Sequence, residues 1–191
     1  MINESYFTAF PTLETDRLLL RAATLEDAIT LKHIRTNPDV MRYMDSDPHY
    51  ELQTSKNFIS YNLEAYENKK VIYWMLEEKS SCTAIGDFSF WKIDEKHHRA
   101  EIGYTLNPDY WGKGYMKEAM LALFSFGFKD LNLHSLEANI NPKNENSKNI
   151  LLKLGFQKEA YFRESFFYNG TYLDSEIYCL LEKDFVSASK L

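Results

Sequence analysis

Apolar residues recur at helical spacing in four segments of this chain. In the second segment, Leu52, Ile59 and Leu63 fall on one side of a helix, with polar residues opposite. The third segment is apolar on nearly all sides, which indicates a buried helix. The first opens with a Thr-Leu-Glu-Asp sequence typical of a capping box, and the fourth is followed by Gly155 in the place of a C-terminal cap. The predicted helices cover residues 24–35, 51–68, 116–129 and 144–154.

Elsewhere the pattern changes to runs of apolar, β-branched and aromatic residues bounded by turn residues, which is typical of strands. Asn37-Pro38 is predicted to end the first helix, and a loop rich in Asp and aromatic residues follows over 41–50. Asn169-Gly170 predicts a hairpin between the last two strands. The predicted strands cover residues 13–21, 71–77, 84–93, 99–106, 135–140, 159–168 and 172–181.

The resulting order of elements is β-α-α-β-β-β-α-β-α-β-β. Three consecutive strands predict antiparallel pairing, and the alternation that follows predicts a mixed sheet with helices packed on its faces, an α/β (α+β) architecture. The chain shows no internal repeat, low-complexity tract or linker, and 191 residues suit a single domain over 1–191.

Composition narrows the classes of function. The chain carries 22 Lys and Arg against 28 Asp and Glu, a net charge of −6, which argues against general nucleic-acid binding and mildly favours a cationic partner such as an amine. No apolar run approaches a membrane span, and residues 1–10 do not resemble a secretion signal, so we expect a cytoplasmic protein without membrane contact. Cys82 and Cys179 are interpreted as reduced thiols, and no metal is expected.

The stretch with the clearest chemistry runs from Glu101 to Ala119. A predicted strand ends there, a turn containing Gly112 and Gly114 follows, and a helix starts at once. Small residues let successive backbone N–H groups point into one concavity, and a helix N-terminus adds partial positive charge. The segment therefore predicts a phosphate or pyrophosphate site, to which Lys113 would add charge.

Two common phosphate-binding patterns are excluded here. A dinucleotide fingerprint needs a third Gly three residues after the second, and Lys117 stands there. A P-loop needs four residues between its glycines and then Lys and Ser or Thr, which is absent. Because Gly-x-Gly alone is also typical of an ordinary turn, its surroundings decide the interpretation.

Those surroundings resemble the GNAT superfamily of acetyl-CoA-dependent N-acetyltransferases. The resemblance is strongest to the branch of ribosomal-protein N-terminal acetyltransferases and their relatives, the RimJ/RimL type. Each motif is weak alone, but together, in this order and spacing, they cover about residues 13–180. They are Leu-Glu-Thr-Asp-Arg-Leu-Leu-Leu-Arg from Leu13 with Leu-Glu-Asp-Ala from Leu25, residues 101–106 with Tyr-Trp-Gly-Lys-Gly-Tyr-Met-Lys-Glu-Ala from Tyr110, and Asn-Glu-Asn-Ser from Asn144 with Leu-Lys-Leu-Gly-Phe from Leu152.

The resemblance implies a GNAT fold, with a mostly antiparallel sheet of about seven strands, splayed at a central bulge, and about four helices. The splayed strand would be residues 102–106, with Gly103 as the bulge residue. It also implies acetyl-CoA as cofactor, with the pyrophosphate motif on Trp111, Gly114 and Met116, the last larger than the residue usual there. The expected cofactor-binding residues are Tyr104, Thr105, Leu106, Trp111, Gly112, Lys113, Gly114, Tyr115, Met116, Asn141, Asn144, Ser147 and Lys153.

The resemblance also assigns catalytic roles. The backbone N–H near Tyr104 would polarise the thioester carbonyl. From the residues alone, Asn144 is a helix N-cap with Ser147 in the first turn, and the resemblance adds Asn144 as a contact of the CoA arm and Ser147 near the thiol. Many family members protonate the leaving thiolate with a Tyr seven residues after this Asn, but Leu151 stands there and cannot donate. The resemblance to this branch implies Ser147 as the substitute acid.

Glu101 is the first candidate for the general base, because it lies on the splayed strand near the expected reaction centre. The alternative is a strand-face carboxylate paired with Arg or Lys. Some relatives use a Glu on the strand after the Leu-Gly-Phe element, where this chain has Phe166, with Glu164 nearby. Three histidines are interpreted as surface or boundary residues: His97, His98 and His134.

The acceptor site is expected between loop 41–50, the second helix and the last hairpin. An Asp beside aromatic residues suits an ammonium group, although aromatic residues also dominate ordinary cores. The candidate substrate-binding residues are Tyr43, Met44, Asp45, Trp74, Phe88 and Trp91.

These observations predict transfer of an acetyl group from acetyl-CoA to a primary amine by direct attack in a ternary complex, because no Cys lies in the motifs to form an acyl-enzyme. The acceptor is either a protein N-terminal α-amine, favoured by the branch, or a small amine such as an antibiotic, polyamine or amino acid. A non-catalytic acyl-CoA-binding regulator is the other alternative. The protein is expected to be a monomer or homodimer.

Overall fold

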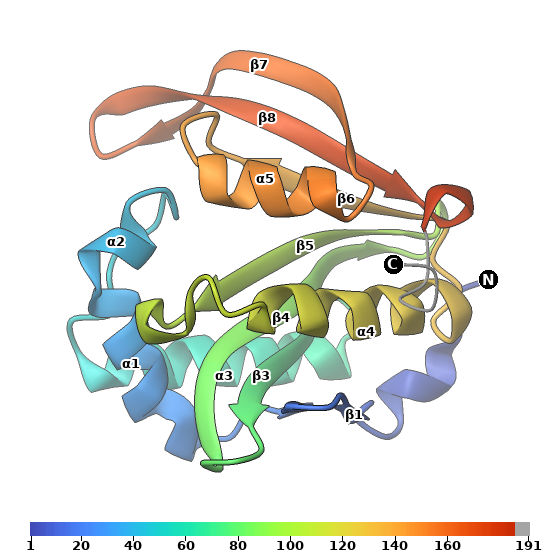
Figure 1. Ribbon diagram of the computed structural model, residues 1–191, viewed down its shortest axis with the longest axis horizontal. Coiled ribbons are helices and arrows are strands. Elements are labelled where there is room, and N and C mark those ends of the chain that lie inside the picture. Colours follow the sequence, from blue (N-terminus) through green and yellow to red (C-terminus); the bar gives the residue numbers. More distant parts are fainter. Residues whose placement is uncertain (186–191) are drawn as a thin grey trace.

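The computed structural model describes residues 1–185. One mixed sheet forms the centre of this part of the chain (Figure 1). Its strand order is β1-β2-β3-β4-β5-β6-β8-β7, and only β5 and β6 are parallel neighbours. The predicted mixed and mostly antiparallel sheet is confirmed, with eight strands in this part of the chain. They are β1 (Leu13–Glu14), β2 (Leu18–Ala22), β3 (Ile72–Glu78), β4 (Thr83–Asp94), β5 (Arg99–Leu106), β6 (Ser135–Ile140), β7 (Gln157–Tyr168) and β8 (Thr171–Leu181).

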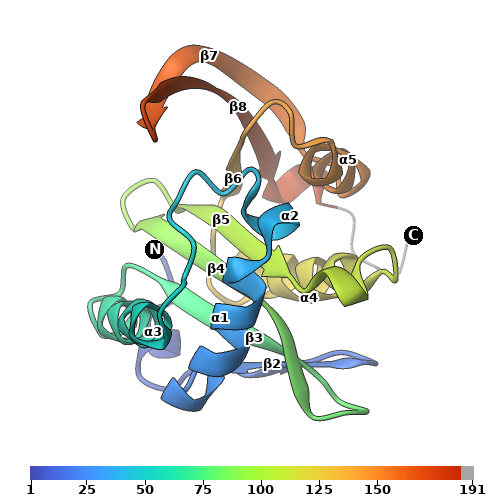
Figure 2. The same cartoon turned by 90° about the vertical axis from the view of Figure 1, so that its left-hand side faces the viewer.

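Five α-helices lie within the same residues, and four of them cover the two faces of the sheet. Figures 1 and 2 show α4 and α5 on one face and α1 and α3 on the other. None of these helices is long and apolar enough to cross a membrane. The helices are α1 (Ala28–Thr36), α2 (Pro38–Met41), α3 (Leu52–Glu67), α4 (Tyr115–Lys129) and α5 (Glu145–Lys153).

The N-terminal strand differs most from its prediction. In place of one strand over 13–21, β1 and β2 form a hairpin in which Leu13 pairs with Leu20. The turn between them is held by the Glu118 carboxylate, which accepts hydrogen bonds from the Thr15 hydroxyl and the Arg17 backbone N–H at 2.5 and 2.9 Å. Because Glu118 lies on α4, about 100 residues away, no local pattern signals this turn.

The first helix begins and ends where the sequence indicates, with one addition. The Thr24-to-Asp27 capping box forms and opens a short 3₁₀ turn before α1. Asn37-Pro38 ends α1 as predicted. Asn37 then caps the extra four-residue helix α2, because its Oδ1 accepts from the Asp39 backbone N–H at 2.9 Å.

The larger part of the core lies between the sheet and the two helices α4 and α5. Trp74 and Phe88, proposed above as substrate-binding residues, are both fully buried in it. The Trp74 indole donates to the Pro11 carbonyl at 2.7 Å, which satisfies its N–H inside the protein. Both residues therefore serve packing, which is the alternative that the sequence analysis left open for them.

A gap opens in the middle of the sheet between β5 and β6. These strands pair at three positions, the last being Glu101 with Glu137. Beyond that pair, β5 continues beside β4 as far as Leu106, and β6 continues beside β8 as far as Ile140. The predicted splaying of residues 102–106 is therefore confirmed.

The bulge predicted at Gly103 is wrong. Gly103 pairs in regular register with Ser89 of β4. The register shifts instead in β4, between Trp91 and Asp94, where Lys92 has a left-handed φ of 48°. The irregularity thus lies on the neighbouring strand, opposite the place where β5 and β6 part.

A buried polar cluster joins α1 to the sheet beneath the splayed strand. The Arg35 guanidinium lies 3.4 Å from Asp87 Oδ1 on β4, and the Thr105 hydroxyl of β5 donates to the other Asp87 oxygen. Arg35 Nε and the Tyr73 hydroxyl have no hydrogen-bond partner among residues 1–185. Burial raises the pKa of Asp87, and the Arg35 charge opposes this. These contacts tie the position of β5 to that of α1.

His49, beside this cluster, predicts a loss of stability in acid. Its Nδ1 lies 3.0 Å from the Ser55 hydroxyl, and burial together with the Arg35 charge lowers the His49 pKa from 6.5 to about 4. The folded state therefore keeps His49 neutral at pH values where the unfolded chain protonates it. The contribution of this residue is complete above pH 6.5 and is lost as the pH falls to about 4, with a total of about 3 kcal/mol.

Urea unfolding of the wild type and of His49→Asn, at pH 7 and pH 4.5, measures this contribution. Asn retains a partner for Ser55 but does not titrate, so the unfolding free energy of the variant should fall less between the two pH values. An equal fall in both proteins would contradict the assignment.

Candidate active site

The loop that follows β5 forms a concavity of backbone N–H groups. Gly112 and Gly114 have φ values of 72° and 82°, a left-handed conformation that favours glycine. Gly114 is the N-cap of α4, so the first N–H groups of this helix also lack helical partners. The predicted anion-binding shape is therefore present between Trp111 and Met116.

Arg17 holds this loop in place through contacts with the loop backbone and with the first turns of α4, a role that the sequence analysis missed. Its Nη1 donates to the Lys113 carbonyl at 3.0 Å, its Nε pairs with Glu118 at 2.6 Å, and its guanidinium lies 4.1 Å from the centre of the Tyr115 ring. Arg17 and Glu118 both belong to motifs that carry the family resemblance, but a spacing of 101 residues gives no sign that they meet.

The edge of β5 that faces the gap presents a backbone donor that has no strand partner within residues 1–185. The Asn107 N–H donates to the Ile85 carbonyl at 2.8 Å, so this residue bonds to β4. Backbone groups of an antiparallel pair alternate in direction, and those of Tyr104 and Leu106 therefore face the gap. The Leu106 carbonyl is taken by the Trp111 indole at 2.8 Å. The Tyr104 N–H faces the gap, beyond the last pair with β6.

Two predicted residues next to Tyr104 point elsewhere. The Thr105 side chain donates to Asp87, and its backbone faces β4, so neither points into the gap. The Leu106 side chain is buried in the core, and only its carbonyl reaches the loop. Met116 is also buried in the core, which shows how the helix start accommodates its larger side chain.

Helix α5 faces the gap with its first turn. Asn144 Oδ1 accepts from the Ser147 backbone N–H at 3.1 Å, which confirms that Asn144 is the N-cap of α5. The buried Tyr104 hydroxyl has no hydrogen-bond partner in the described part of the chain. Burial raises the pKa of Tyr104 to about 12, and the neighbouring Ser147 side chain opposes part of this shift. Leu151 is fully buried and cannot take part.

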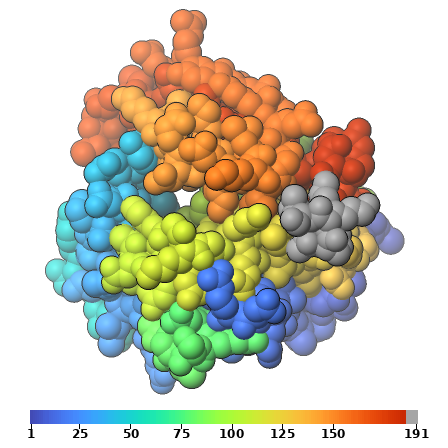
Figure 3. Space-filling model, in the orientation of Figure 1, coloured from blue at the N-terminus to red at the C-terminus, as the bar shows by residue number. Residues whose placement is uncertain are grey.

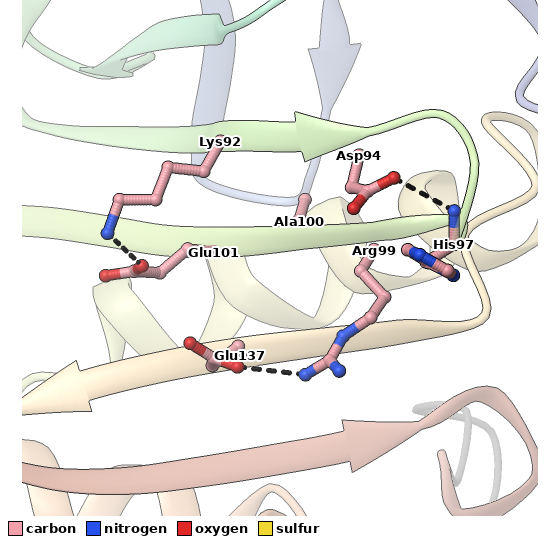
Figure 4. Close-up of a pocket in the computed structure, with 7 residues that line it drawn as sticks. All are labelled: Lys92, Asp94, His97, Arg99, Ala100, Glu101 and Glu137. Carbon is pink, nitrogen blue, oxygen red and sulfur yellow. Dashed lines mark hydrogen bonds and ion pairs between the residues drawn. The ribbon is translucent and has the colours of Figure 1, made fainter.

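Glu101 lies on the face of β5 opposite to the Tyr104 side chain, at the point where β5 and β6 part. Its carboxylate lines a cavity of about 210 Å³. Figure 4 shows this carboxylate next to the Lys92 ammonium, with Arg99 and Glu137 paired nearby. Burial raises the pKa of Glu101, against the opposing effect of Lys92. Glu101 is therefore ion-paired, as the alternative interpretation expects. His97, interpreted above as a surface residue, lines the same cavity.

Loop 41–50 contacts the last hairpin. Asp47 accepts a hydrogen bond from the Tyr168 hydroxyl of β7 at 3.1 Å, which joins the loop to the last hairpin. Burial raises the pKa of Asp45, and the Asn141 side chain, which follows β6, opposes the shift. Tyr43 and Met44 are half-buried beside it. Figure 3 shows the surface hollowed between this loop, the segment after β5 and α5.

The remaining candidates differ in where they lie. Lys153 is exposed at the last residue of α5. Phe166 is exposed on β7, and the Glu164 backbone N–H donates to Asp174 at 2.8 Å on the same hairpin. Trp91 is 37% exposed beside Glu101 and stays a candidate for the acceptor site.

Comparison with known proteins gives a consistent result. A family model described as an acetyltransferase (GNAT) domain matches residues 17–157. The uncharacterized N-acetyltransferase YoaA of Bacillus subtilis is 35% identical over 173 residues, which are 91% of this chain and 98% of that protein. Spermidine N(1)-acetyltransferase of Escherichia coli is 26% identical over 171 residues, 90% of this chain and 89% of that protein.

Solved structures share the architecture. A GNAT-family acetyltransferase from Bacillus anthracis has a TM-score of 0.81 and 28% identity, and the match covers 91% of this chain and 99% of that one. The ribosomal L7/L12 α-N-protein acetyltransferase RimL, solved with coenzyme A, has a TM-score of 0.81 and 19% identity over 90% of this chain and 98% of that one. Proteins similar to this one thus act, by name, on both a polyamine and a protein N-terminus.

Proposed function

Because the chain belongs to the GNAT family of acetyl-CoA-dependent N-acetyltransferases, we propose that its acceptor is a primary amine that arrives as an ammonium ion beside Glu101. The observation that carries this proposal is the buried Glu101 carboxylate at the last pair between β5 and β6. Asp45, on the loop that bounds the gap, adds a second acidic group on the route of a cation.

The residues around the gap fit acetyl-CoA, which supplies the acetyl thioester. The N–H groups of the loop from Trp111 to Met116 would hold the pyrophosphate, and Lys113 would add charge. The Tyr104 N–H, which faces the gap beyond the last pair with β6, would donate to the thioester carbonyl. Asn144 would contact the CoA arm from the start of α5.

Glu101 would take a proton from the acceptor nitrogen, because only the neutral amine has a free lone pair. Its raised pKa favours this role, since burial makes the ionised carboxylate a stronger proton acceptor. On the other face of β5, Ser147 and the unpartnered Tyr104 hydroxyl would donate toward the leaving sulfur. The base and the acid would then act from opposite faces of one strand.

Gly114→Val tests the anion-binding loop. A β-branched residue at φ 82° forces the loop out of its left-handed conformation, and the affinity for acetyl-CoA should fall at least about tenfold. Gly170→Val is the matched control, because Gly170 has a φ of 78° in the β7–β8 turn with nothing within 4 Å of an added Cβ. Calorimetric titration with acetyl-CoA compares them. Equal losses of affinity would contradict the assigned loop.

The acceptor is tested with two panels of amines and acetyl-CoA, following CoA release and product mass. One panel contains small amines, including spermidine, and the other contains peptides with free N-termini. Turnover in either panel supports the proposal, and the panel that reacts defines the acceptor class. Binding of acetyl-CoA without turnover in either panel would contradict it and favour the non-catalytic regulator.

A further inference from the structure

The Lys92 side chain makes two contacts typical of ammonium recognition. Its Nζ lies 2.7 Å from Glu101 Oε2 and 4.0 Å from the centre of the Trp91 ring (Figure 4 shows the contact with Glu101). The carboxylate is nearly buried, whereas the Lys92 side chain is 59% exposed. A carboxylate and an indole face are the groups that recognise an alkylammonium ion. Here the ion is supplied by the chain itself.

The backbone of β4 is distorted at the residue that supplies it. Successive side chains of a regular strand point to opposite faces, yet Trp91 and Lys92 are both exposed. The register shift between Trp91 and Asp94, with a φ of 48° at Lys92, accounts for this arrangement. A left-handed conformation is unfavourable for a side chain of this kind. The bulge therefore places Lys92 over the Trp91 ring and beside Glu101 against a local conformational preference.

We propose that the Trp91 ring and the Glu101 carboxylate form a subsite for the acceptor's ammonium group, and that Lys92 occupies this subsite until the acceptor displaces it. The inference rests on the proposed function, since Glu101 is the proposed base. The subsite suits a primary amine at the end of a flexible methylene chain, because that is the chemistry of the side chain it holds. A peptide α-amine, with a branched carbon and an amide next to the nitrogen, matches it less well.

Lys92 would then act as a tethered competitor. A group on a short flexible tether competes as if it were present at millimolar concentration. Amines that reach the subsite with only one contact would be held off, whereas an acceptor with further contacts along the gap would displace Lys92. The side chain would thus set a threshold for acceptor affinity without touching the cofactor loop.

The test uses n-butylammonium as the probe and the full-length protein. Its binding is followed by the NMR signal of the Trp91 indole N–H, identified by its absence in Trp91→Phe. Lys92→Met removes the competing charge and keeps the length of the side chain, so the dissociation constant should fall about fivefold. Lys92→Arg keeps a cation and should bind like the wild type. Lys96→Met, an exposed position in the next turn, controls for net charge.

The double variant Lys92→Met/Glu101→Gln should lose the gain in affinity, because the carboxylate is gone. Equal dissociation constants in the wild type and Lys92→Met, or a Trp91 signal that does not respond in either protein, would overturn the inference. The proposed function is judged separately by turnover. A tighter probe in Lys92→Met without turnover of any amine would leave the subsite standing and the proposed function refuted, whereas turnover with an unchanged probe affinity would refute only the subsite.

Discussion

Glu101→Gln is expected to lower kcat about 100- to 1,000-fold and to leave the affinity for acetyl-CoA unchanged. General-base catalysis contributes rate factors of this order, and the amide of Gln matches the carboxylate in size but does not accept a proton from an ammonium ion. Glu101 lies near the start of β5, whereas the loop that holds the pyrophosphate motif follows the end of this strand, so cofactor binding should not change. Steady-state kinetics with the best amine of the panel, together with titration of acetyl-CoA, measures both quantities.

Glu137→Gln is the matched control for this prediction. Glu137 lines the same cavity and is the strand partner of Glu101, but its carboxylate is paired with Arg99 at 2.9 Å. Its replacement should change kcat less than about threefold. A comparable loss of kcat in both variants, or a Glu101→Gln enzyme close to the wild type, would show that Glu101 is not the base.

The dependence of kcat on pH gives a second check. Because burial raises the pKa of Glu101, the carboxylate becomes protonated at a higher pH than an exposed Glu. The wild-type kcat should therefore fall as the pH drops through this raised pKa, and Glu101→Gln should lack that part of the profile. The same acid limb in both enzymes would assign it to another group.

Arg35→Met is expected to lower the free energy of unfolding by about 3–5 kcal/mol. The substitution leaves the buried Asp87 carboxylate without its cationic partner, and an uncompensated buried charge is strongly destabilising. Replacing both partners, in Arg35→Met/Asp87→Leu, should restore part of the loss, because an apolar pair needs no compensation. Urea unfolding at pH 7 measures all three proteins.

An exposed ion pair is the control for this cluster. Arg42 pairs with Asp39 at 2.5 Å, but both side chains are exposed, so Arg42→Met should change the unfolding free energy by less than about 1 kcal/mol. If Arg35→Met were as mild as Arg42→Met, the cluster would not hold α1 to the sheet.

The regular elements could be predicted from the sequence because their signals are local. The spacing of apolar residues located α3 and α4, and Asn169-Gly170 located the last hairpin. The splayed strand was also located correctly, but through the family resemblance and not through periodicity. Where local preference and tertiary structure agree, sequence reasoning succeeds.

Two of the differences from the prediction come from contact between distant residues. The N-terminal strand breaks at a turn held by Glu118, and Arg35 meets Asp87 across 52 positions. Alternation shows which residues share a face but not which face is covered, so it does not decide between the acceptor site and the core for Trp74, which lies in the core. Lys92 was missed because a Lys in a strand pattern gives no sign of the bulge that turns it toward Glu101.

The structure of the complex with acetyl-CoA tests the central claim most directly. The account predicts the pyrophosphate on the N–H groups between Trp111 and Met116, with the thioester carbonyl oxygen about 3 Å from the Tyr104 N–H. The acetyl group should lie in the gap between β5 and β6. An acetyl group bound outside this gap, or a Tyr104 N–H paired with another strand in the complex, would contradict the account.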